Sequence, residues 1–570
     1  MTLNDYRDQF RKNMMCMSQT MVDNPNMNDA VEFLFNNRNL NLESADDLEN
    51  LILETARIAG ISYTKIKDIP DMWHWFVNTF FWMLTSQCFE PEETAAFSEY
   101  IINIIGHFFS DCCGEISMLI SSFVFMRFNL SCPKYISRDE YCRVTTRSSI
   151  PSVKGMRSFL ADPDFENFLS YYLSLCPGRE SDFYSYFEVQ DDGSYICYLV
   201  GYLSNDKSGY FRMNLECFYE KHGDIQTIFD CGSLLGIDEE GIRVLKDMRS
   251  SGKSFILKNL SIDCRVLLKS VGLESAFNKN GRLKKINLSN CPVISEGANG
   301  IVYRVSDEVV AKAFKSEPNY YDIVRERISL RNALITGIPA PISLGYAEYD
   351  GRIVTLMELI DAKTLLKIIS TENDFEEYII RYAQFVRRLH KIQDRDKLKN
   401  FRRNMFGTYI LSKTDITDSI LPVKYRGKAR SILSSINEPD CLIHGDIQPN
   451  NIMVSGDEMM FIDFDSFSTG KAVYDLGSLY RTLFDYKADG IPGYNGFLKL
   501  PVDKCSKIWD IFVGEYYREE SEQVRQHRIG VARMIGIILC LAKHIKKKTG
   551  SEIISEEAEE LKRCFDEAVG

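Results

Sequence analysis

Two short polar loops at the ends of one apolar hairpin constrain this chain most strongly. The first loop closes the run LIHGDIQPNN at residues 442–451, and the second is IDFD at residues 462–465. The turn sequence SGD at 455–457 separates two short apolar stretches between them, which predicts a β-hairpin. Because the two ends of a hairpin meet, we expect Asn451 and Asp463 to lie together.

The side chains of these loops suit the transfer of a phosphoryl group from ATP. That reaction needs a positioned hydroxyl, a bound Mg²⁺ and neutralised phosphate charge. Asp446 is the candidate base, and Asn451 and Asp463 are the candidate ligands of Mg²⁺, which prefers oxygen. The order Asp, Asn five residues later and Asp after a hairpin is that of a kinase catalytic loop. The tripeptide HGD alone is also ordinary turn chemistry, so the flanking hairpin carries the prediction.

A second turn containing glycine lies upstream. Gly297, Asn299 and Gly300 precede a strand pattern at 301–305, and a polar turn then leads to VVAKAF, which carries Lys312. Glycine lets backbone N–H groups approach phosphate oxygens, and lysine adds a positive charge. An ordinary hairpin with a surface lysine has the same pattern. The position of this hairpin relative to the distal loop favours ATP binding.

A helical pattern follows residue 318 and continues to about residue 334. Ile323, Glu326 and Leu330 recur at spacings of three and four, so they share one face. A carboxylate on an apolar face is costly unless it is paired, and Lys312 is the expected partner of Glu326. The alternative is a solvated carboxylate at the edge of that face, screened by neighbouring arginines.

The stretch IVTLMELI at residues 353–360 is a further buried strand pattern. We expect it to enter a hinge between two lobes. Backbone groups around Glu358 and Ile360 are the candidates for hydrogen bonds to the edge of adenine.

From residue 294 to its C-terminus, the chain resembles the aminoglycoside phosphotransferase and choline kinase superfamily, which shares the protein-kinase fold. The resemblance implies that Asp446 in HGDIQPNN is the catalytic base and that Asn451 and Asp463 are metal ligands. It also implies that Lys312 in VVAKAF binds phosphate, with Glu326 as its acidic partner.

Two further positions support the resemblance, and one spacing indicates which branch of the superfamily the chain resembles. Asp475 in YDLG matches an aspartate that braces the catalytic loop in the family, and the pair Leu389-His390 at a helix end is typical of it. Only eleven residues separate Asp463 from Asp475, too few for the long activation segment of protein kinases. We therefore expect a small-molecule hydroxyl substrate rather than a peptide.

Extra helices are expected to wall the substrate pocket. They are a charged insertion at 394–437 and three tail helices near 502–518, 526–546 and 551–568. A group of acidic residues in the tail would suit a cationic substrate, and a solvated helix face is the alternative. These residues are Glu515, Glu519, Glu520 and Glu522.

Composition limits the other classes of function. The chain has 570 residues, 45% of them hydrophobic, and a net charge of -12, which predicts a globular protein of about three or four domains. A pI near 5.3 leaves no basic stripe, so neither nucleic acid nor an anionic membrane is an expected partner. Sixteen cysteines without a CxxC pair, and a start without an apolar leader, predict free thiols in a cytoplasmic protein.

Residues 1–180 are predicted to form a helical domain without chemistry of its own. Cys112 and Cys113 near His107 invite a metal interpretation, but they also suit an apolar helix core. The apolar stretch 73–84 is interrupted by polar residues and is too short to span a bilayer, so we expect a core helix. The polar stretch 148–163 is the expected boundary.

Strand and helix patterns alternate between residues 185 and 287. They predict a small α/β layer with parallel strands, and residues 228–277 resemble a STAS domain, the fold of anti-sigma-factor antagonists. The resemblance implies a role in binding a protein or sensing a ligand. Where family members regulated by phosphorylation carry serine, this chain has Glu239, which either favours the helix N-terminus or mimics a phosphate.

The sequence thus predicts a multidomain protein with an α-helical N-terminal region (1–180), a small α/β STAS-like domain (185–287) and an α+β bilobal protein-kinase-like domain (290–570). ATP and Mg²⁺ are the expected cofactors. The expected acceptor is a hydroxyl of a small molecule, and the STAS-like domain is the expected contact for a protein partner. Two alternatives remain: a protein kinase acting on a signalling partner, and a nucleotide-binding scaffold without turnover.

Overall fold

The computed structural model of the chain contains two compact units. Unit 1 comprises Met1–Val324 and Ile342–Glu358, and unit 2 comprises Arg325–Pro341 and Leu359–Gly570. The structure describes residues 2–17, 25–86, 89–106, 108–109, 113–136, 138–145, 159, 162–177, 183–190, 193–277, 283–296, 300–316, 319–372, 374–394, 398, 401, 404–485 and 493–568.

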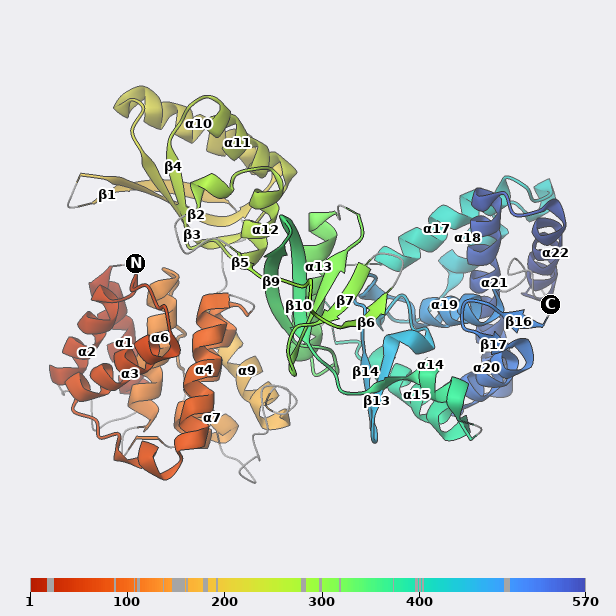
Figure 1. Cartoon of the computed structure of the whole chain (residues 1–570), viewed down its shortest axis with the longest axis horizontal. Coiled ribbons are helices and arrows are strands. Elements are labelled where there is room, and N and C mark those ends of the chain that lie inside the picture. The colour runs from red at the N-terminus through yellow and green to blue at the C-terminus, as the bar shows by residue number, and fades with distance from the viewer. Residues whose placement is uncertain are drawn as a thin grey trace. The chain divides into compact units, whose positions relative to one another are not determined.

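The first part of unit 1 is helical, as predicted (Figure 1). Its core is aromatic: Phe76, Phe80 and Phe97 are fully buried, with ring centroids of Phe76 5.6 and 6.0 Å from those of the other two. The apolar stretch 73–84 lies in α4 and is a core helix. No helix in the described residues is long and apolar enough to cross a membrane. The helices are α1 (Leu3–Met17), α2 (Pro25–Asn36), α3 (Ala45–Ala59), α4 (Pro70–Ser86), α5 (Pro91–Tyr100), α6 (Cys113–Arg127), α7 (Arg138–Thr145) and α9 (Pro163–Leu175).

Two expectations for this region fall outside the described residues. They are the metal interpretation of Cys112 with His107 and most of the boundary at 148–163. The described core instead contains a carboxylate that the sequence did not reveal. Glu99 on α5 is fully buried and accepts hydrogen bonds from the hydroxyls of Tyr135 at 2.6 Å, Ser121 at 2.9 Å and Tyr141 at 3.0 Å. Burial raises the pKa of Glu99 to about 7.

A four-stranded sheet in the order β1-β2-β3-β4 follows in unit 1. Strands β2, β3 and β4 are parallel, as predicted, and α10 and α11 make the connections between them. Strand β1 is an antiparallel edge strand that the sequence did not reveal. The elements are β1 (Tyr184–Val189), β2 (Tyr195–Leu203), α10 (Asn205–His222), β3 (Thr227–Ile237), α11 (Glu239–Ser250), β4 (Phe255–Lys258) and α12 (Ile262–Ser270).

The start of α11 favours the structural interpretation of its acidic residues. The side chain of Asp238 accepts hydrogen bonds from the backbone N–H groups of Glu240 and Gly241, each at 3.0 Å, and so caps the helix. Glu239 lies in the first turn, where a negative charge is favourable. Gly241 is required for packing, because an added Cβ would lie 2.7 Å from the carbonyl oxygen of Leu203 on β2.

A six-stranded sheet in the order β5-β9-β10-β8-β7-β6 completes unit 1. Its core contains Leu288, Ala311, Ala347 and Val354. Helix α12 is fastened to this sheet, because Lys269 forms an ion pair with Glu348 on β9. The strands are β5 (Lys284–Lys285), β6 (Val293–Glu296), β7 (Gly300–Arg304), β8 (Val309–Phe314), β9 (Ser343–Tyr349) and β10 (Arg352–Glu358).

Helix α13 (Tyr320–Ile335), predicted for 318–334, begins in unit 1 and ends in unit 2. The rest of unit 2 is mainly helical, with short sheets in the orders β11-β13-β14, β12-β15 and β16-β17. The three tail helices and the helical insertion are present as predicted. The helices are α14 (Leu365–Thr371), α15 (Glu376–His390), α17 (Met405–Asp418), α18 (Lys428–Ser435), α19 (Ala472–Phe484), α20 (Val502–Tyr516), α21 (Glu522–Lys547) and α22 (Ser551–Ala568). The strands are β11 (Lys363–Thr364), β12 (Cys441–Ile443), β13 (Ile452–Ser455), β14 (Glu458–Phe461), β15 (Ser468–Gly470), β16 (Tyr494–Asn495) and β17 (Leu500–Pro501).

Candidate active site

The predicted hairpin exists in unit 2 and brings the two polar loops together. Strands β13 and β14 are antiparallel, with Ile452 opposite Phe461 at one end and Ser455 opposite Glu458 at the turn. Beyond the open end, the backbone N–H of Ile462 donates to the carbonyl oxygen of Asn451 at 2.9 Å. Asn451 directly precedes β13, and Asp463 comes two residues after the end of β14. Both residues therefore lie at the open end of the hairpin.

The two carboxylate oxygens of Asp446 differ in their hydrogen bonds. Its Oδ2 accepts hydrogen bonds from Gln448 Nε2 at 2.8 Å and from Asn451 Nδ2 at 3.1 Å. Asn451 Nδ2 also donates to the carbonyl oxygen of Asp446 at 3.0 Å. Within the described part of the chain, Oδ1 of Asp446 is buried and has no hydrogen-bond partner. This oxygen is therefore the candidate acceptor for the proton of a substrate hydroxyl.

Asp475 holds the backbone of the proposed catalytic loop, residues 444–451, which agrees with the role that the resemblance implied. Its side chain is fully buried at the start of α19. Its Oδ1 accepts from the N–H of Gly445 at 2.6 Å, and its Oδ2 accepts from the N–H of His444 at 2.8 Å. His390, at the end of α15, contacts the same Oδ2 through Nε2 at 3.0 Å. A buried carboxylate needs several partners, and here these partners connect α15, α19 and the loop.

The loop leaves little room for other residues. Gly445 has φ of +80°, and an added Cβ would lie 2.8 Å from the carbonyl oxygen of Ser466. The ring of His444 is fully buried and packs 5.0 Å from Phe461 and 5.4 Å from Phe464. The histidine and glycine of HGD therefore have structural roles, because they pack the loop against aromatic rings and fit it beside Ser466.

Three carboxylates of unit 2 form a group with the chemistry of a divalent-metal site. One carboxylate oxygen from each of Glu326, Asp463 and Asp465 lies within 4.8 Å of the other two. The N–H of Phe461 donates to the carbonyl oxygen of Pro339 at 3.1 Å, which ties the segment that follows α13 to the hairpin. Hard cations such as Mg²⁺ take oxygen ligands of this kind, so the donor set fits the ion.

Asp463 has an unusual backbone conformation. Its φ is +68°, a left-handed value that is costly for residues other than glycine and that concentrates at functional sites. Asp465 was not among the predicted ligands, although its spacing of two residues from Asp463 was visible in IDFD. Glu326 is buried, as predicted, and its position beside Asp463 was not foreseen.

The predicted nucleotide residues of unit 1 lie on the six-stranded sheet. Lys312 on β8 lies between Val302 on β7 and Thr355 on β10. Gly300 permits this packing, since an added Cβ would lie 2.8 Å from the carbonyl oxygen of Ala313. Gly297 and Asn299 lie outside the described residues. Lys312 and Glu326 belong to different units, so their pairing stays a prediction.

The two predicted hinge residues also belong to different units, Glu358 to unit 1 and Ile360 to unit 2. Glu358 ends β10, and its backbone N–H donates to the carbonyl oxygen of Ile342 at 2.9 Å. That N–H is therefore engaged, and the prediction for adenine rests on the carbonyl group of Glu358 and the N–H of Ile360. The carbonyl oxygen of Ile360 accepts from Ala362 at 3.0 Å.

Part of the chain matches a family of known proteins. Residues 290–495 match the phosphotransferase enzyme family, APH. This APH region contains Asp446, Asn451, Asp463 and the bracing residue Asp475. No curated protein matches the chain.

Several solved structures are similar to about half of the chain. A choline/ethanolamine kinase family protein from Mesorhizobium loti is 16% identical over 53% of this chain and 92% of its own, with a TM-score of 0.33. The aminoglycoside phosphotransferase APH(2")-IIia, in complex with GDP and kanamycin, is 15% identical over 49% of this chain and 94% of its own, with a TM-score of 0.35. Amicoumacin kinase hAmiN, in complex with AMP-PNP, Ca²⁺ and amicoumacin, is 16% identical over 53% and 92%, with a TM-score of 0.31.

The four acidic residues of the tail, which the sequence offered as a site for a cationic substrate, are all paired with arginines. Each carboxylate is in an ion pair with an arginine: Glu515 with Arg518, Glu519 with Arg387, Glu520 with Arg528, and Glu522 with Arg525. Their charge is therefore neutralised on the surface of the APH region and its tail. The structure favours the alternative of a solvated helix face, and a preference for a cationic substrate has no support from these residues.

Proposed function

We propose that the APH region is an ATP- and Mg²⁺-dependent kinase that transfers the γ-phosphate to a hydroxyl group of a small molecule. The observation that carries the proposal is the fixed arrangement in unit 2 of a buried, unengaged oxygen on Asp446 and the carboxylate group of Glu326, Asp463 and Asp465. A base beside an oxygen-rich metal site is what phosphoryl transfer requires.

The proposal gives a task to each of these residues. Asp446 accepts the proton of the substrate hydroxyl through Oδ1, while Gln448 and Asn451 fix the orientation of its other oxygen. Mg²⁺ bound by Asn451, Asp463 and Asp465 would supply charge neutralisation and would orient the phosphates. Lys312 adds a positive charge to the phosphates, and Glu326 is its proposed partner as well as the third carboxylate of the metal group.

The class of acceptor is proposed from the short segment between Asp463 and Asp475. It leaves no long activation segment for a peptide, and helices α17 to α22 offer walls for a small pocket. The similar solved structures include complexes with kanamycin and with amicoumacin, so hydroxyl-rich antibiotics and choline-like alcohols are the first compounds to test. The division into three domains, the STAS-like regulatory role and the cytoplasmic location remain part of the proposal.

The test is a screen of metabolites, aminoglycosides and amino alcohols for ATP consumption, with each product checked by mass for an added phosphate. For the best substrate, Asp446→Ala is expected to lower kcat by about 10²- to 10⁴-fold, the usual contribution of a general base. Asp463→Ala is expected to lower it through loss of Mg²⁺. Asp457→Ala is the matched control, because Asp457 lies fully exposed in the turn of the same hairpin.

Equal turnover by Asp446→Ala and the wild type would contradict the proposal. The alternative of a protein kinase is separated by incubating the protein with labelled ATP and a cell lysate and then resolving proteins from metabolites. Label in proteins alone would reject the small-molecule acceptor. Nucleotide binding without label transfer to either fraction would support the scaffold instead.

A further inference from the structure

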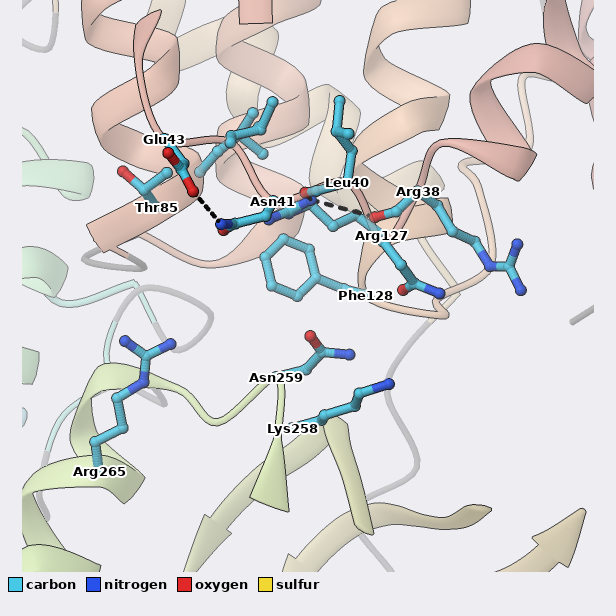
Figure 2. Close-up of a pocket in the computed structure, with 13 residues that line it drawn as sticks. Arg38, Leu40, Asn41, Glu43, Thr85, Arg127, Phe128, Lys258, Asn259 and Arg265 are labelled. Atoms are coloured by element: carbon cyan, nitrogen blue, oxygen red, sulfur yellow. Dashed lines mark hydrogen bonds between the residues drawn. The ribbon is translucent and has the colours of Figure 1, made fainter. Parts of the chain in front are cut away.

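A polar pocket of about 360 Å³ lies within unit 1, and none of the residues proposed for phosphoryl transfer lines it (Figure 2). One side is formed by the segment that follows α2 and by the C-terminal end of α6. The other side is formed by the end of β4 and the start of α12. The two sides are in direct contact, because the hydroxyl of Ser233 on β3 donates to the carbonyl oxygen of Phe128 at 3.4 Å.

The pocket is lined by positive charge in a chain whose net charge is -12. Arg38 and Arg127 contribute from the helical side, and Lys258 and Arg265 contribute from the α/β side. Among the described lining residues the only carboxylate is that of Glu43, and it accepts a hydrogen bond from the amide of Asn41 at 2.9 Å. Four cations around one cavity repel one another, and an anion that enters the cavity relieves this repulsion.

Three of the four cations form no ion pair within the described part of the chain, although the buried carboxylate of Asp230 on β3 interacts electrostatically with Lys258 and Arg38. These three are Arg38, Arg127 and Lys258. Arg127 instead donates through Nη1 to the carbonyl oxygens of Arg38 at 3.2 Å and Leu40 at 2.9 Å. Burial lowers the pKa of Arg127. The protein therefore keeps a partly buried guanidinium group among neutral partners, which is costly unless a bound anion compensates.

The basic side chains are also held in place before any ligand binds. The guanidinium group of Arg38 lies 3.8 Å from the ring centroid of Phe35, and its Nη1 donates to the carbonyl oxygen of Phe35 at 2.6 Å. Arg265 donates through Nε to the carbonyl oxygen of Leu260 at 3.0 Å. Side chains that are already ordered lose less entropy when a ligand binds.

The pocket also lies at the carboxyl end of a parallel strand, where α/β folds usually bind their ligands. Lys258 is the last residue of β4, and Asn259 follows it with φ of +55° in the connection to α12. The amide of Asn259 is oriented by a hydrogen bond from Nδ2 to Asp230 on β3 at 3.0 Å. Ligands of open α/β sheets bind outside the carboxyl ends of the strands, and here that end faces Arg38 and Arg127.

We propose that this pocket binds a small organic phosphate. Guanidinium groups favour phosphate because their planar set of donors matches its oxygens. The volume suits a metabolite rather than a polymer, and the amides of Asn41 and Asn259 together with the ring of Phe128 supply contacts for the rest of such a molecule (Figure 2). The ligand would bind in the part of the chain that precedes the APH region.

The test is calorimetric titration of the full chain, free of nucleotide and Mg²⁺, with inorganic phosphate and with ribose 5-phosphate. Both probes are expected to bind, and ribose 5-phosphate is expected to bind more tightly. Lys258→Met is expected to weaken binding by about tenfold, the value of one hydrogen bond to a charged group. Arg38→Gln is expected to have a similar effect. Unchanged melting temperatures without phosphate would show that both variants fold.

Two control variants decide where the phosphate binds. Lys246→Met removes an exposed lysine of α11 that does not line the pocket, and Lys312→Met removes the proposed phosphate-binding lysine of the APH region. Binding that survives both controls and is weakened by Lys258→Met supports the proposal. Binding lost with Lys312→Met and retained with Lys258→Met would overturn it, as would no binding of either probe at millimolar concentration. Tighter binding of citrate than of ribose 5-phosphate would reject phosphate as the recognised group.

Discussion

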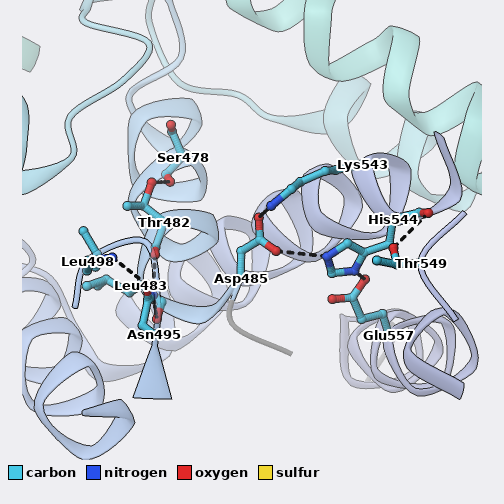
Figure 3. Close-up of polar contacts among 10 residues, drawn as sticks. All are labelled: Ser478, Thr482, Leu483, Asp485, Asn495, Leu498, Lys543, His544, Thr549 and Glu557. Carbon is cyan, nitrogen blue, oxygen red and sulfur yellow. Dashed lines mark hydrogen bonds and ion pairs between the residues drawn. The ribbon is translucent and has the colours of Figure 1, made fainter. Parts of the chain in front are cut away.

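The two ends of helix α19 each carry an aspartate paired with a histidine, and the two pairs differ in what they hold. At the start, Asp475 contacts His390 and accepts from two backbone N–H groups of the catalytic loop. At the end, Asp485 contacts His544 at 3.1 Å and Lys543 at 2.6 Å on α21, and His544 contacts Glu557 on α22 at 3.0 Å (Figure 3).

The difference lies in the partners of each carboxylate. Asp475 binds the main chain, so its geometry is transmitted to the position of Asp446 one residue beyond Gly445. Asp485 belongs to a network of side-chain charges, with two carboxylates and two cations, that joins the tail helices to α19. The first pair should therefore control turnover and stability together, whereas the second should control stability and its dependence on pH.

The largest effect is expected for Asp475→Asn. The amide has one oxygen acceptor, so an N–H group of the loop would face an NH₂ group inside the protein. Removing one member of a buried polar network costs about 3–5 kcal/mol, and a displacement of Asp446 by about 1 Å costs about 10²-fold in turnover. Chemical denaturation and the rate of phosphate transfer measure the two effects.

Asp510→Asn is the matched control for this prediction. Asp510 is an exposed aspartate of α20 in the same unit, so its replacement should change the free energy of unfolding by less than about 0.5 kcal/mol. If Asp475→Asn retained full turnover, the link between α19 and the catalytic loop would be wrong, even where stability fell.

His544→Gln tests the other end of α19 through pH. Hydrogen bonds to Asp485 and Glu557 raise the pKa of His544 to about 9. A histidine whose pKa is higher in the folded state stabilises the fold fully below its unfolded pKa of about 6.5, and this contribution is lost as pH rises through 9. The wild type should therefore lose stability between pH 6.5 and pH 9. Urea denaturation at pH 6 and at pH 9.5 measures this loss.

At pH 6 the variant should be less stable than the wild type by about 3 kcal/mol, because two buried carboxylates lose their shared cation. The gap should shrink at pH 9.5. His527→Gln, an exposed position on the same helix, should leave the pH dependence unchanged. A constant gap at both pH values would show that His544 acts by packing rather than by charge.

Asp485, the partner of His544, contributes to stability in a different range of pH. Burial alone would raise the pKa of Asp485, but hydrogen bonds from His544 and Lys543 outweigh burial and lower it. Its contribution is therefore present at neutral pH and lost only in acid, as the pH falls through that lowered pKa. The loss of stability above pH 6.5 is thus a signature of His544 alone within this cluster.

The sequence predicted the catalytic end of α19 better than the distal end, for a physical reason. Asp446, Asn451 and Asp463 are placed by one hairpin, so their spacing along the chain fixes their spacing in space. Asp485 and His544 are far apart in sequence, and their contact depends on how α21 packs against α19. No local pattern encodes that packing.

The same reason applies to unit 1. The parallel strands β2 to β4 were visible as apolar patterns, but β1 (Tyr184–Val189) is an edge strand with no buried residue along it, so it lacks the alternation that marks a half-buried strand. The basic pocket combines Arg38 and Arg127 with Lys258 and Arg265, which only the tertiary fold brings together. Asp465 was within reach of sequence analysis, since it lies two residues from Asp463.

Tyr516→Phe is expected to have the smallest effect and separates the parts of the Asp475 network. The hydroxyl of Tyr516 lies 2.7 Å from Nδ1 of His390, on the side of the ring away from Asp475. Its removal should cost about 1 kcal/mol, the net value of one hydrogen bond, and should leave turnover unchanged. Tyr517→Phe is the control, because the hydroxyl of Tyr517 has no hydrogen-bond partner among the described residues. Tyr516→Phe could instead lower the free energy of unfolding as much as Asp475→Asn does. That result would mean that the hydrogen bonds through His390, and not those to the two backbone N–H groups, hold the catalytic loop.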